Sequence, residues 1–114
     1  PTIVLKNKEP FIILGSPGGS RIITAVLQTI LNVTVHNMNI QEAVSAPRVH
    51  SQWLPDVIMA ESYSIIKDVE TSLINKGHEI LPYKNIGDVN AILINEDGYF
   101  GGTDIRGENT AIGY

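Results

Sequence analysis

FIILGSPGGSRIITAVLQTIL, residues 11–31, passes from a β-rich run through a glycine-rich junction into a helical pattern. Phe11–Leu14 consists of the bulky and β-branched residues that favour strands. After Arg21, apolar residues recur at the i, i+3, i+4 spacing of a helix with one buried face. They are Ile22, Ile23, Val26, Leu27, Ile30 and Leu31. The stretch therefore predicts a strand that leads directly into a helix, and the helix should extend to about His36.

Two antiparallel hairpins are expected near the two ends of the chain. Thr2–Leu5 is another β-rich run, and it should pair with Phe11–Leu14 across a short polar linker. Val89–Ile94 and Tyr99–Phe100 flank Asn95–Gly98, whose Asp-Gly pair supplies the positive φ that tight hairpin turns need.

Two further helices are expected in the middle of the chain. Asn39 and Glu42 have the spacing of a capping box, so a short helix should follow Asn39 and stop before Pro47. A second amphipathic pattern ends at Lys76 and Gly77, where glycine suits the left-handed cap. Its apolar positions are Ile65, Ile66, Val69 and Leu73, and the neighbouring extended segments are Val49–Trp53, Val57–Glu61 and His78–Leu81. Because strands occur in hairpins and helices cluster, we expect an α+β fold with a mostly antiparallel sheet.

The composition limits the possible classes of function. The chain has 114 residues, which suits one domain or part of one. The net charge is −4 and the eight basic residues are scattered, which argues against nucleic-acid binding. The absence of cysteine removes disulfides and thiolate metal sites. The apolar runs are far too short to span a bilayer.

The chain is rich in apolar residues for its size. They make up 43% of the sequence, a high share for a small free-standing domain. We therefore expect part of its surface to pack against something else. The chain begins at Pro1 rather than at a methionine, and we interpret it as a processed product or a fragment.

The junction Gly15–Ser20 is the candidate functional site. Glycines between a strand and a helix let backbone N–H groups approach a ligand, with the positive end of the helix behind them. One interpretation is an anion site, although the GxxxxGK spacing of nucleotide-binding loops is absent. Another is an oxyanion hole, for which the adjacent amides of Gly18 and Gly19 are suited. A third is a tight turn with Ser20 as the helix N-cap. The residues alone leave the three open.

The histidines and the segment Arg48–Trp53 are expected to have structural roles. His36, His50 and His78 lack the spacing of a metal-ligand set, so no metal site is expected. The segment is chemically rich but shows no carboxylate partner. We expect it to form a strand with one wet face and with Trp53 in the core.

The remaining polar residues do not supply a nucleophile. The serines and threonines have no general base nearby in the sequence, and no Gly-x-Ser-x-Gly elbow occurs. If the chain belongs to an enzyme, the attacking group must lie elsewhere. Asp104 and Arg106 could form an ion pair that fixes the C-terminal tail, and an exposed pair of this kind contributes less than about 1 kcal/mol.

Four stretches of the sequence carry a family resemblance. They are PTIVLKNKEPFIILGSPGGSRIITAVLQTILNV (1–33), NIQEAVSAPRVHSQWLPD (39–56), NKGHEI (75–80) and AIGY (111–114). Together they resemble the C-terminal part of the small subunit of γ-glutamyltranspeptidase, also called glutathione hydrolase. GSPGGSRI and APRVHSQWLPD keep the family's order and spacing. The resemblance covers essentially the whole chain, so residues 1–114 are expected to form that C-terminal segment as a single domain or part-domain.

The resemblance implies an N-terminal-nucleophile hydrolase fold, a four-layer αββα sandwich built by two subunits cut from one precursor. In that family an N-terminal threonine attacks a γ-glutamyl amide, with its own α-amino group as base. The acyl-enzyme then passes its γ-glutamyl group to water or to an amino acid or peptide. That threonine is not in this chain, so the chain alone is expected to be inactive. No cofactor is implied.

Only two residues of this chain receive a role from the resemblance. Gly18 and Gly19 match the glycine pair whose amides form the family's oxyanion hole and contact the substrate. The implied partners are the rest of the small subunit, the large subunit, and a small γ-glutamyl substrate such as glutathione. Neither nucleic acid nor a membrane span is expected. Family habit implies a periplasmic or secreted location.

Other functions are compatible with the same residues. Related branches include poly-γ-glutamate depolymerases and cephalosporin acylases. A protein of a different class would be a non-catalytic α+β module whose glycine loop holds an anion. A degenerate paralogue kept as a structural subunit is a further alternative.

Overall fold

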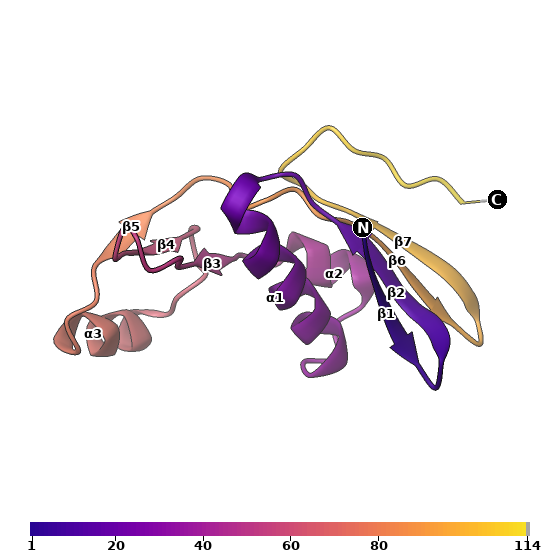
Figure 1. The fold of residues 1–114 in the computed structure, drawn as a ribbon, viewed down its shortest axis with the longest axis horizontal. Helices are drawn as coiled ribbons and strands as arrows, with labels where there is room; N and C mark the ends of the chain where they lie inside the picture. The colour runs from indigo at the N-terminus through magenta and orange to yellow at the C-terminus, as the bar shows by residue number, and fades with distance from the viewer. Residues whose placement is uncertain (114) are drawn as a thin grey trace.

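The chain forms two lobes joined in an elongated molecule (Figure 1). The structure is a computed structural model that describes residues 1–113. It measures 48 × 29 × 23 Å, and its radius of gyration of 15.1 Å exceeds the roughly 13 Å of a compact chain of this length. One lobe contains a four-stranded sheet with two helices. The other contains a three-stranded sheet with the third helix.

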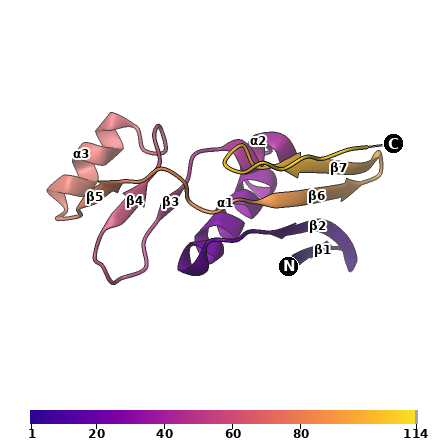
Figure 2. The same ribbon diagram turned by 90° about the horizontal axis from the view of Figure 1, so that it is seen from above.

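The four-stranded sheet consists of the two expected hairpins (Figure 2). Its strands, in spatial order, are β1 (Thr2–Lys6), β2 (Glu9–Gly15), β6 (Asn90–Asn95) and β7 (Gly98–Thr103), and all neighbours are antiparallel. Asn7 and Lys8 in the first turn have positive φ, as does Gly98 in the second. These left-handed residues reverse the chain within a few positions. Both hairpin predictions are confirmed, although most strands extend beyond the predicted bounds.

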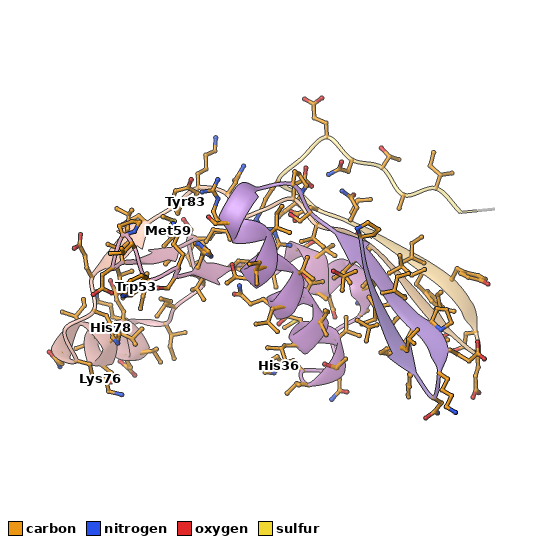
Figure 3. All side chains as sticks on the ribbon, in the orientation of Figure 1. His36, Trp53, Met59, Lys76, His78 and Tyr83 are labelled. Atoms are coloured by element: carbon orange, nitrogen blue, oxygen red, sulfur yellow. The ribbon has the colours of Figure 1, made fainter. Side chains whose placement is uncertain are left out.

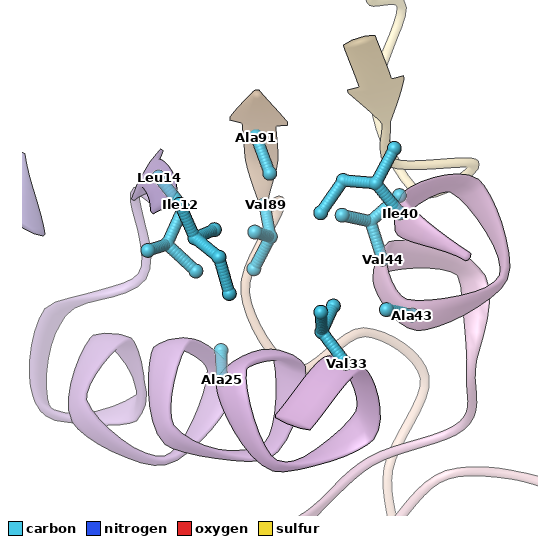
Figure 4. Close-up of a cluster of buried hydrophobic side chains, with 9 residues drawn as sticks. All are labelled: Ile12, Leu14, Ala25, Val33, Ile40, Ala43, Val44, Val89 and Ala91. Carbon is cyan, nitrogen blue, oxygen red and sulfur yellow. The ribbon is translucent and has the colours of Figure 1, made fainter. Parts of the chain in front are cut away.

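Two helices, α1 (Ile22–Thr34) and α2 (Ile40–Ser45), pack on one face of this sheet, and the core lies between them and the strands (Figure 4). The buried side chains are Ile12, Leu14, Ala25, Val33, Ile40, Ala43, Val44, Val89 and Ala91. The predicted capping box begins α2: Asn39 Oδ1 accepts the Glu42 N–H at 2.9 Å, and the Glu42 carboxylate accepts the Asn39 N–H at 3.0 Å. No helix among residues 1–113 is long and apolar enough to cross a membrane.

The buried face of α1 differs from the predicted one. Ala25, Thr29 and Val33 pack toward the sheet, whereas Ile23 and Leu27 are exposed. Apolar residues occupy so much of the helix circumference that their spacing does not identify the buried arc. Small side chains on the buried arc let the helix lie close to the sheet, and an apolar arc is left uncovered on its outer side.

The second lobe contains the three-stranded sheet. It consists of β3 (Val49–His50), β4 (Ile58–Ala60) and β5 (Ile80–Pro82), and α3 (Lys67–Asn75) connects the last two. The pair β3–β4 is antiparallel and the pair β4–β5 is parallel. Across the two sheets of residues 1–113, four of the five strand pairs are antiparallel, as expected, and β4–β5 is the exception. As predicted, the helix ends before Gly77, which has a φ of +93°.

Two predictions for this lobe were wrong. The strands at residues 49–53 and 57–61 are shorter than predicted. Trp53 is not in the core: its residue is 79% exposed and has a positive φ of 75° (Figure 3). A left-handed residue cannot continue a strand, so the chain leaves the sheet after His50 and Trp53 projects from the loop.

Four charged side chains form a buried cluster where the two lobes meet. Arg48 Nη1 lies 2.8 Å from Asp104 Oδ2, and Arg106 Nη1 lies 2.8 Å from Asp104 Oδ1. The Arg106 guanidinium also pairs with the Glu61 carboxylate. The sequence indicated only the Asp104–Arg106 pair and treated it as exposed. The structure buries this pair: the side chains of Asp104 and Arg106 are 0% and 8% exposed.

Backbone groups complete the cluster. The Asp104 carboxylate accepts the Val89 N–H at 2.7 Å, and the Glu61 carboxylate accepts the Ile86 N–H at 2.6 Å. Arg48 donates to the carbonyls of Ile86 and Val44. Two positive and two negative charges are thus balanced and almost fully hydrogen-bonded, which is the condition under which buried charges are tolerated.

Burial and hydrogen bonding act in opposite directions on the acidic groups. Burial alone would raise the pKa of Asp104, but the Val89 N–H and the Arg106 guanidinium outweigh it, so the pKa lies below its ordinary value. In Glu61, burial is outweighed by bonds from Arg106 and from the Ile86 N–H, and the pKa is lowered as well. Both carboxyl groups are therefore held ionised in the folded chain.

Asp104→Asn should destabilise the protein by about 3–5 kcal/mol, because it leaves Arg48 buried without its balancing charge. The measurement is the free energy of unfolding from urea denaturation at pH 7. Glu70→Gln is the control, since Glu70 forms an exposed pair with Lys67 at 2.7 Å, and its loss should cost under about 0.5 kcal/mol. Equal losses in the two variants would contradict a stabilising role for the cluster.

Acid should weaken the fold through the same cluster. The folded pKa values of Asp104 and Glu61 lie below their unfolded values of about 4. Their contribution is therefore complete above the unfolded values and is lost as the pH falls through the folded ones. We expect the urea midpoint to be flat from pH 7 to about pH 5 and to fall below it. Asp104→Asn should show a shallower fall. Identical profiles would exclude Asp104 as a source of the acid sensitivity.

Candidate functional site

The glycine junction lies between β2 and the first long helix. A single turn of 3-10 helix, η1 (Gly19–Arg21), connects it to α1. Gly18 has a φ of +138° and Gly19 a φ of +61°. L side chains rarely adopt the first value and are strained at the second, so the backbone path favours glycine at both positions and most strongly at Gly18.

The amides of the two glycines are free to bind a ligand. Among residues 1–113, neither the Gly18 N–H nor the Gly19 N–H has a hydrogen-bond partner. Gly19 is exposed and Gly18 is half-buried, so both are close to the surface. They lie at the start of the helical segment that continues into α1, where the helix dipole favours negative charge. The junction thus presents two adjacent unpaired donors at a positive helix end.

The loop rests on the connection between β5 and β6, which the sequence analysis did not identify. A Cβ built on Gly18 would lie 3.4 Å from the Gly87 Cα, and one on Gly87 would lie 2.7 Å from Ser16 Oγ. Ser16 Oγ accepts the Asp88 N–H at 2.8 Å and donates to the Pro17 carbonyl at 2.7 Å. A side chain at residue 87 would therefore overlap Ser16, and the hydrogen bond between Ser16 and Asp88 attaches the glycine loop to the β5–β6 connection.

Ser20 does not cap the helix, so that prediction was wrong. Neither η1 nor α1 has a side-chain cap, and Ser20 Oγ instead donates to Gln52 Oε1 at 2.6 Å. The sequence analysis assigned no role to Gln52. The only available signal was its place in the polar segment Arg48–Trp53, because the contact joins residues far apart in the chain.

The three histidines do not gather at one place. His36 follows α1 and His78 follows α3, and both are exposed (Figure 3). His50 is buried in β3, where Nδ1 lies 2.7 Å from Thr24 Oγ1. Among residues 1–113, no three His, Cys, Asp or Glu side chains form a group able to hold a metal ion.

A basic residue lies next to the glycine loop. Arg21 ends η1, and its guanidinium lies over the Tyr83 ring, 5.3 Å from the centroid. Tyr83 directly follows β5, so this contact also connects the loop region with the second lobe. A fixed positive charge near the loop adds to the preference of the site for an anionic group.

Comparison with known proteins assigns the family. The sequence model of the γ-glutamyltranspeptidase family matches residues 1–114. The chain belongs to the γ-glutamyltranspeptidase family. It is 40% identical over 107 residues to the glutathione hydrolase proenzyme of Escherichia coli K12, covering 93% of this chain and 18% of that protein.

Two further comparisons bear on fold and function. A crystal structure of a γ-glutamyltranspeptidase mutant from Helicobacter pylori superposes with a TM-score of 0.87 at 52% identity, covering 94% of this chain and 60% of that one. The acylase ACY 1 proenzyme of Pseudomonas sp. strain SE83 is 37% identical over 99 residues, covering 86% of this chain and 17% of that protein. This chain thus spans about a fifth of the length of these curated relatives.

The family assignment confirms the expected fold class. The α+β arrangement, with helices on one face of a mostly antiparallel sheet, is part of the N-terminal-nucleophile hydrolase fold of γ-glutamyltranspeptidases. Of the stretches that carried the resemblance, AIGY includes Tyr114, which lies outside the described residues.

Gly87→Ala should destabilise the protein by about 2–4 kcal/mol, because it combines a positive φ with overlap against Ser16 and Ala25. The matched control is Gly77→Ala, which has a positive φ but no atom within 4 Å of the added Cβ, and it should cost only about 1 kcal/mol. Urea denaturation measures both. If Gly87→Ala lost no more free energy of unfolding than Gly77→Ala, the β5–β6 connection under the glycine loop would tolerate a side chain.

Proposed function

We propose that this chain is the C-terminal segment of the small subunit of a γ-glutamyltransferase, and that the Gly18 and Gly19 amides form its oxyanion hole. The complete enzyme would cleave γ-glutamyl amides such as glutathione. It would pass the γ-glutamyl group to water, an amino acid or a peptide. The nucleophile and most of the substrate contacts would come from parts of the protein outside this chain.

The observation that carries the proposal is the pair of adjacent amides without internal partners. A half-buried backbone N–H such as that of Gly18 is normally hydrogen-bonded, so its lack of a partner, next to the exposed Gly19 N–H at a positive helix end, supports a ligand here. Positive φ values at both glycines remove the side chains that would block an approaching oxygen. Membership in the γ-glutamyltranspeptidase family supplies the reaction class.

The proposed chemistry proceeds through two tetrahedral intermediates. A nucleophilic hydroxyl attacks the γ-carbonyl carbon, its proton passes to the base, and the π electron pair moves onto the carbonyl oxygen. The two amides stabilise this oxyanion more strongly than the ground-state carbonyl, which is the source of rate acceleration. The base returns the proton to the leaving nitrogen, the carbon–nitrogen bond breaks as the oxyanion re-forms the carbonyl, and an ester to the enzyme remains. Water or an acceptor amine then attacks the ester by the same route.

The proposed partners follow from the size and shape of the chain. Its relatives are described as proenzymes, and it matches about a fifth of their length. We propose that the remaining small subunit and the large subunit of the same precursor complete the sandwich. Exposed apolar side chains such as Ile23 and Leu27 support a covered surface in the complete protein. By family resemblance, we propose a periplasmic or secreted location.

A second candidate function is amide cleavage by an acylase. It is favoured by the 37% identity with the Pseudomonas acylase proenzyme. The oxyanion hole would serve either substrate, because both reactions develop charge on an attacked carbonyl oxygen. The ratio of kcat/KM values for a γ-glutamyl anilide and for an acylated cephalosporin separates the two functions. A non-catalytic anion-binding module would turn over neither.

Gly18→Pro should lower kcat for a γ-glutamyl anilide by about a hundredfold or more, because proline removes one of the two donors. The assay uses the full-length protein that contains this chain. Gly18→Ala is the comparison variant: its Cβ also disfavours a φ of +138°, although less strictly than the proline ring, and it keeps the N–H, so it should lose clearly less activity.

Two results would contradict the proposal. One is wild-type turnover in Gly18→Pro, and the other is equal losses in the proline and alanine variants. Gly98→Pro controls for the backbone conflict, because Gly98 has a φ of +131° in the β6–β7 turn, away from the glycine loop. It should weaken the fold without a specific loss of kcat.

A further inference from the structure

A series of hydrogen bonds, the His50–Gln52–Ser20 series, runs from the interior of the molecule to the glycine loop. It begins at His50, which is 3% exposed. His50 Nε2 lies 2.9 Å from Gln52 Oε1, and the same oxygen accepts Ser20 Oγ at 2.6 Å. Ser20 directly follows Gly19, so one glutamine oxygen connects a buried ring with the residue next to the proposed oxyanion hole.

The amide nitrogen of Gln52 fixes the donor and acceptor roles in the His50–Gln52–Ser20 series. Gln52 Nε2 donates to the Leu54 carbonyl at 2.9 Å, which orients the amide and leaves Oε1 as the atom facing His50 and Ser20. An amide oxygen only accepts, so His50 Nε2 must carry a hydrogen and Ser20 must donate its own. Gln52 therefore uses both lone pairs of one oxygen to hold two donors.

Several hydrogen bonds hold His50, the buried end of the series. His50 Nδ1 contacts Thr24 Oγ1 of α1 at 2.7 Å. Next to it, Gln28 of the same helix binds both backbone groups of Val49: it donates to the carbonyl at 2.8 Å and accepts the N–H at 3.0 Å. These contacts tie β3 to α1 and hold His50 in place beside Gln52.

The glycine loop, at the exposed end of the series, needs such an anchor. Gly18 and Gly19 have the widest conformational freedom of any residue type, and no side-chain cap holds the start of η1. Ser16 restrains the loop on one side through the Asp88 N–H. On the other side, the Ser20–Gln52 bond connects the end of the loop with the second lobe, next to the Arg21–Tyr83 contact.

We propose that Gln52 is a positioning residue for the Gly18–Gly19 amide pair, and that it acts through Ser20. This inference rests on the proposed oxyanion hole. Gln52 touches no reacting atom in it. Donors stabilise an oxyanion only when they are fixed in place before the charge forms, and small displacements of catalytic groups have large effects on rate. Gln52 supplies that fixation from the second lobe.

Gln52→Leu should lower kcat for a γ-glutamyl anilide about tenfold, less than the loss of a whole donor, with KM within about twofold of wild type. The split is expected because a misplaced oxyanion hole weakens the transition state and leaves ground-state binding intact. Gln52→Glu should restore part of the activity: one carboxylate oxygen still accepts from both Ser20 and His50, but the other cannot donate to the Leu54 carbonyl as Gln52 Nε2 does. All assays use the full-length protein.

Gln41→Leu is the matched control. Gln41 also bridges two elements, since it accepts the Thr103 N–H at 3.1 Å and donates to the Thr103 carbonyl at 2.8 Å. It lies in α2, away from the glycine loop. Both leucine variants should lower the melting temperature by a similar small amount, but Gln41→Leu should leave kcat unchanged. A general structural effect would lower kcat equally in both.

Three results decide between the inference and the function on which it rests. Loss of kcat in Gly18→Pro and in Gln52→Leu, with partial rescue by Gln52→Glu, supports both. Loss in Gly18→Pro together with a Gln52→Leu variant that behaves like Gln41→Leu overturns the positioning role alone. Full activity of Gly18→Pro overturns the oxyanion hole and the positioning role with it. Should Gln52→Leu fail to fold, Ser20→Ala removes the same bond from the exposed side, and unchanged kcat there overturns the positioning role.

Discussion

The buried cluster of Arg48, Glu61, Asp104 and Arg106 is the constraint on which the rest of the structure depends. Its members come from both lobes and from the C-terminal tail, and their charges balance. Two of its acceptor bonds hold the N–H groups of Ile86 and Val89. The residues between them, Gly87 and Asp88, contact the glycine loop. The cluster thus fixes the position of the proposed site although it lies outside it.

The proposed oxyanion hole is therefore restrained from two directions. Asp88 holds Ser16 before the two glycines, and Gln52 holds Ser20 after them. Each restraint comes from a different part of the chain and is itself attached to a rigid element. A glycine pair is needed for the backbone path and for open access, but it costs conformational entropy when it is ordered. Side-chain bonds at both ends offset that cost and preorganise the donors.

Local features of the fold were predictable from the sequence, and contacts between distant residues were not. The hairpin turns and the Asn39 capping box depend on residues a few positions apart, so their spacing is visible. The glycine junction was visible for the same reason. Gln52 and Gly87 were missed because their roles arise only from folding. The burial of the Asp104–Arg106 pair was missed because Arg48 joins it from another element. The apolar circumference of α1 hid which arc faces the sheet.

The balance between apolar and polar contacts explains why the proposed site lies where the lobes meet. The apolar core belongs to the four-stranded lobe, and burial of apolar surface is non-directional, so it sets no atom to within a fraction of an ångström. Hydrogen bonds and ion pairs are directional, and they concentrate at the meeting of the lobes around Arg48, His50 and Asp104. A reaction that depends on two amide donors in fixed positions needs directional contacts, namely hydrogen bonds and ion pairs. The glycine loop lies beside these directional contacts, and the outer side of α1 keeps apolar residues such as Ile23 and Leu27 exposed.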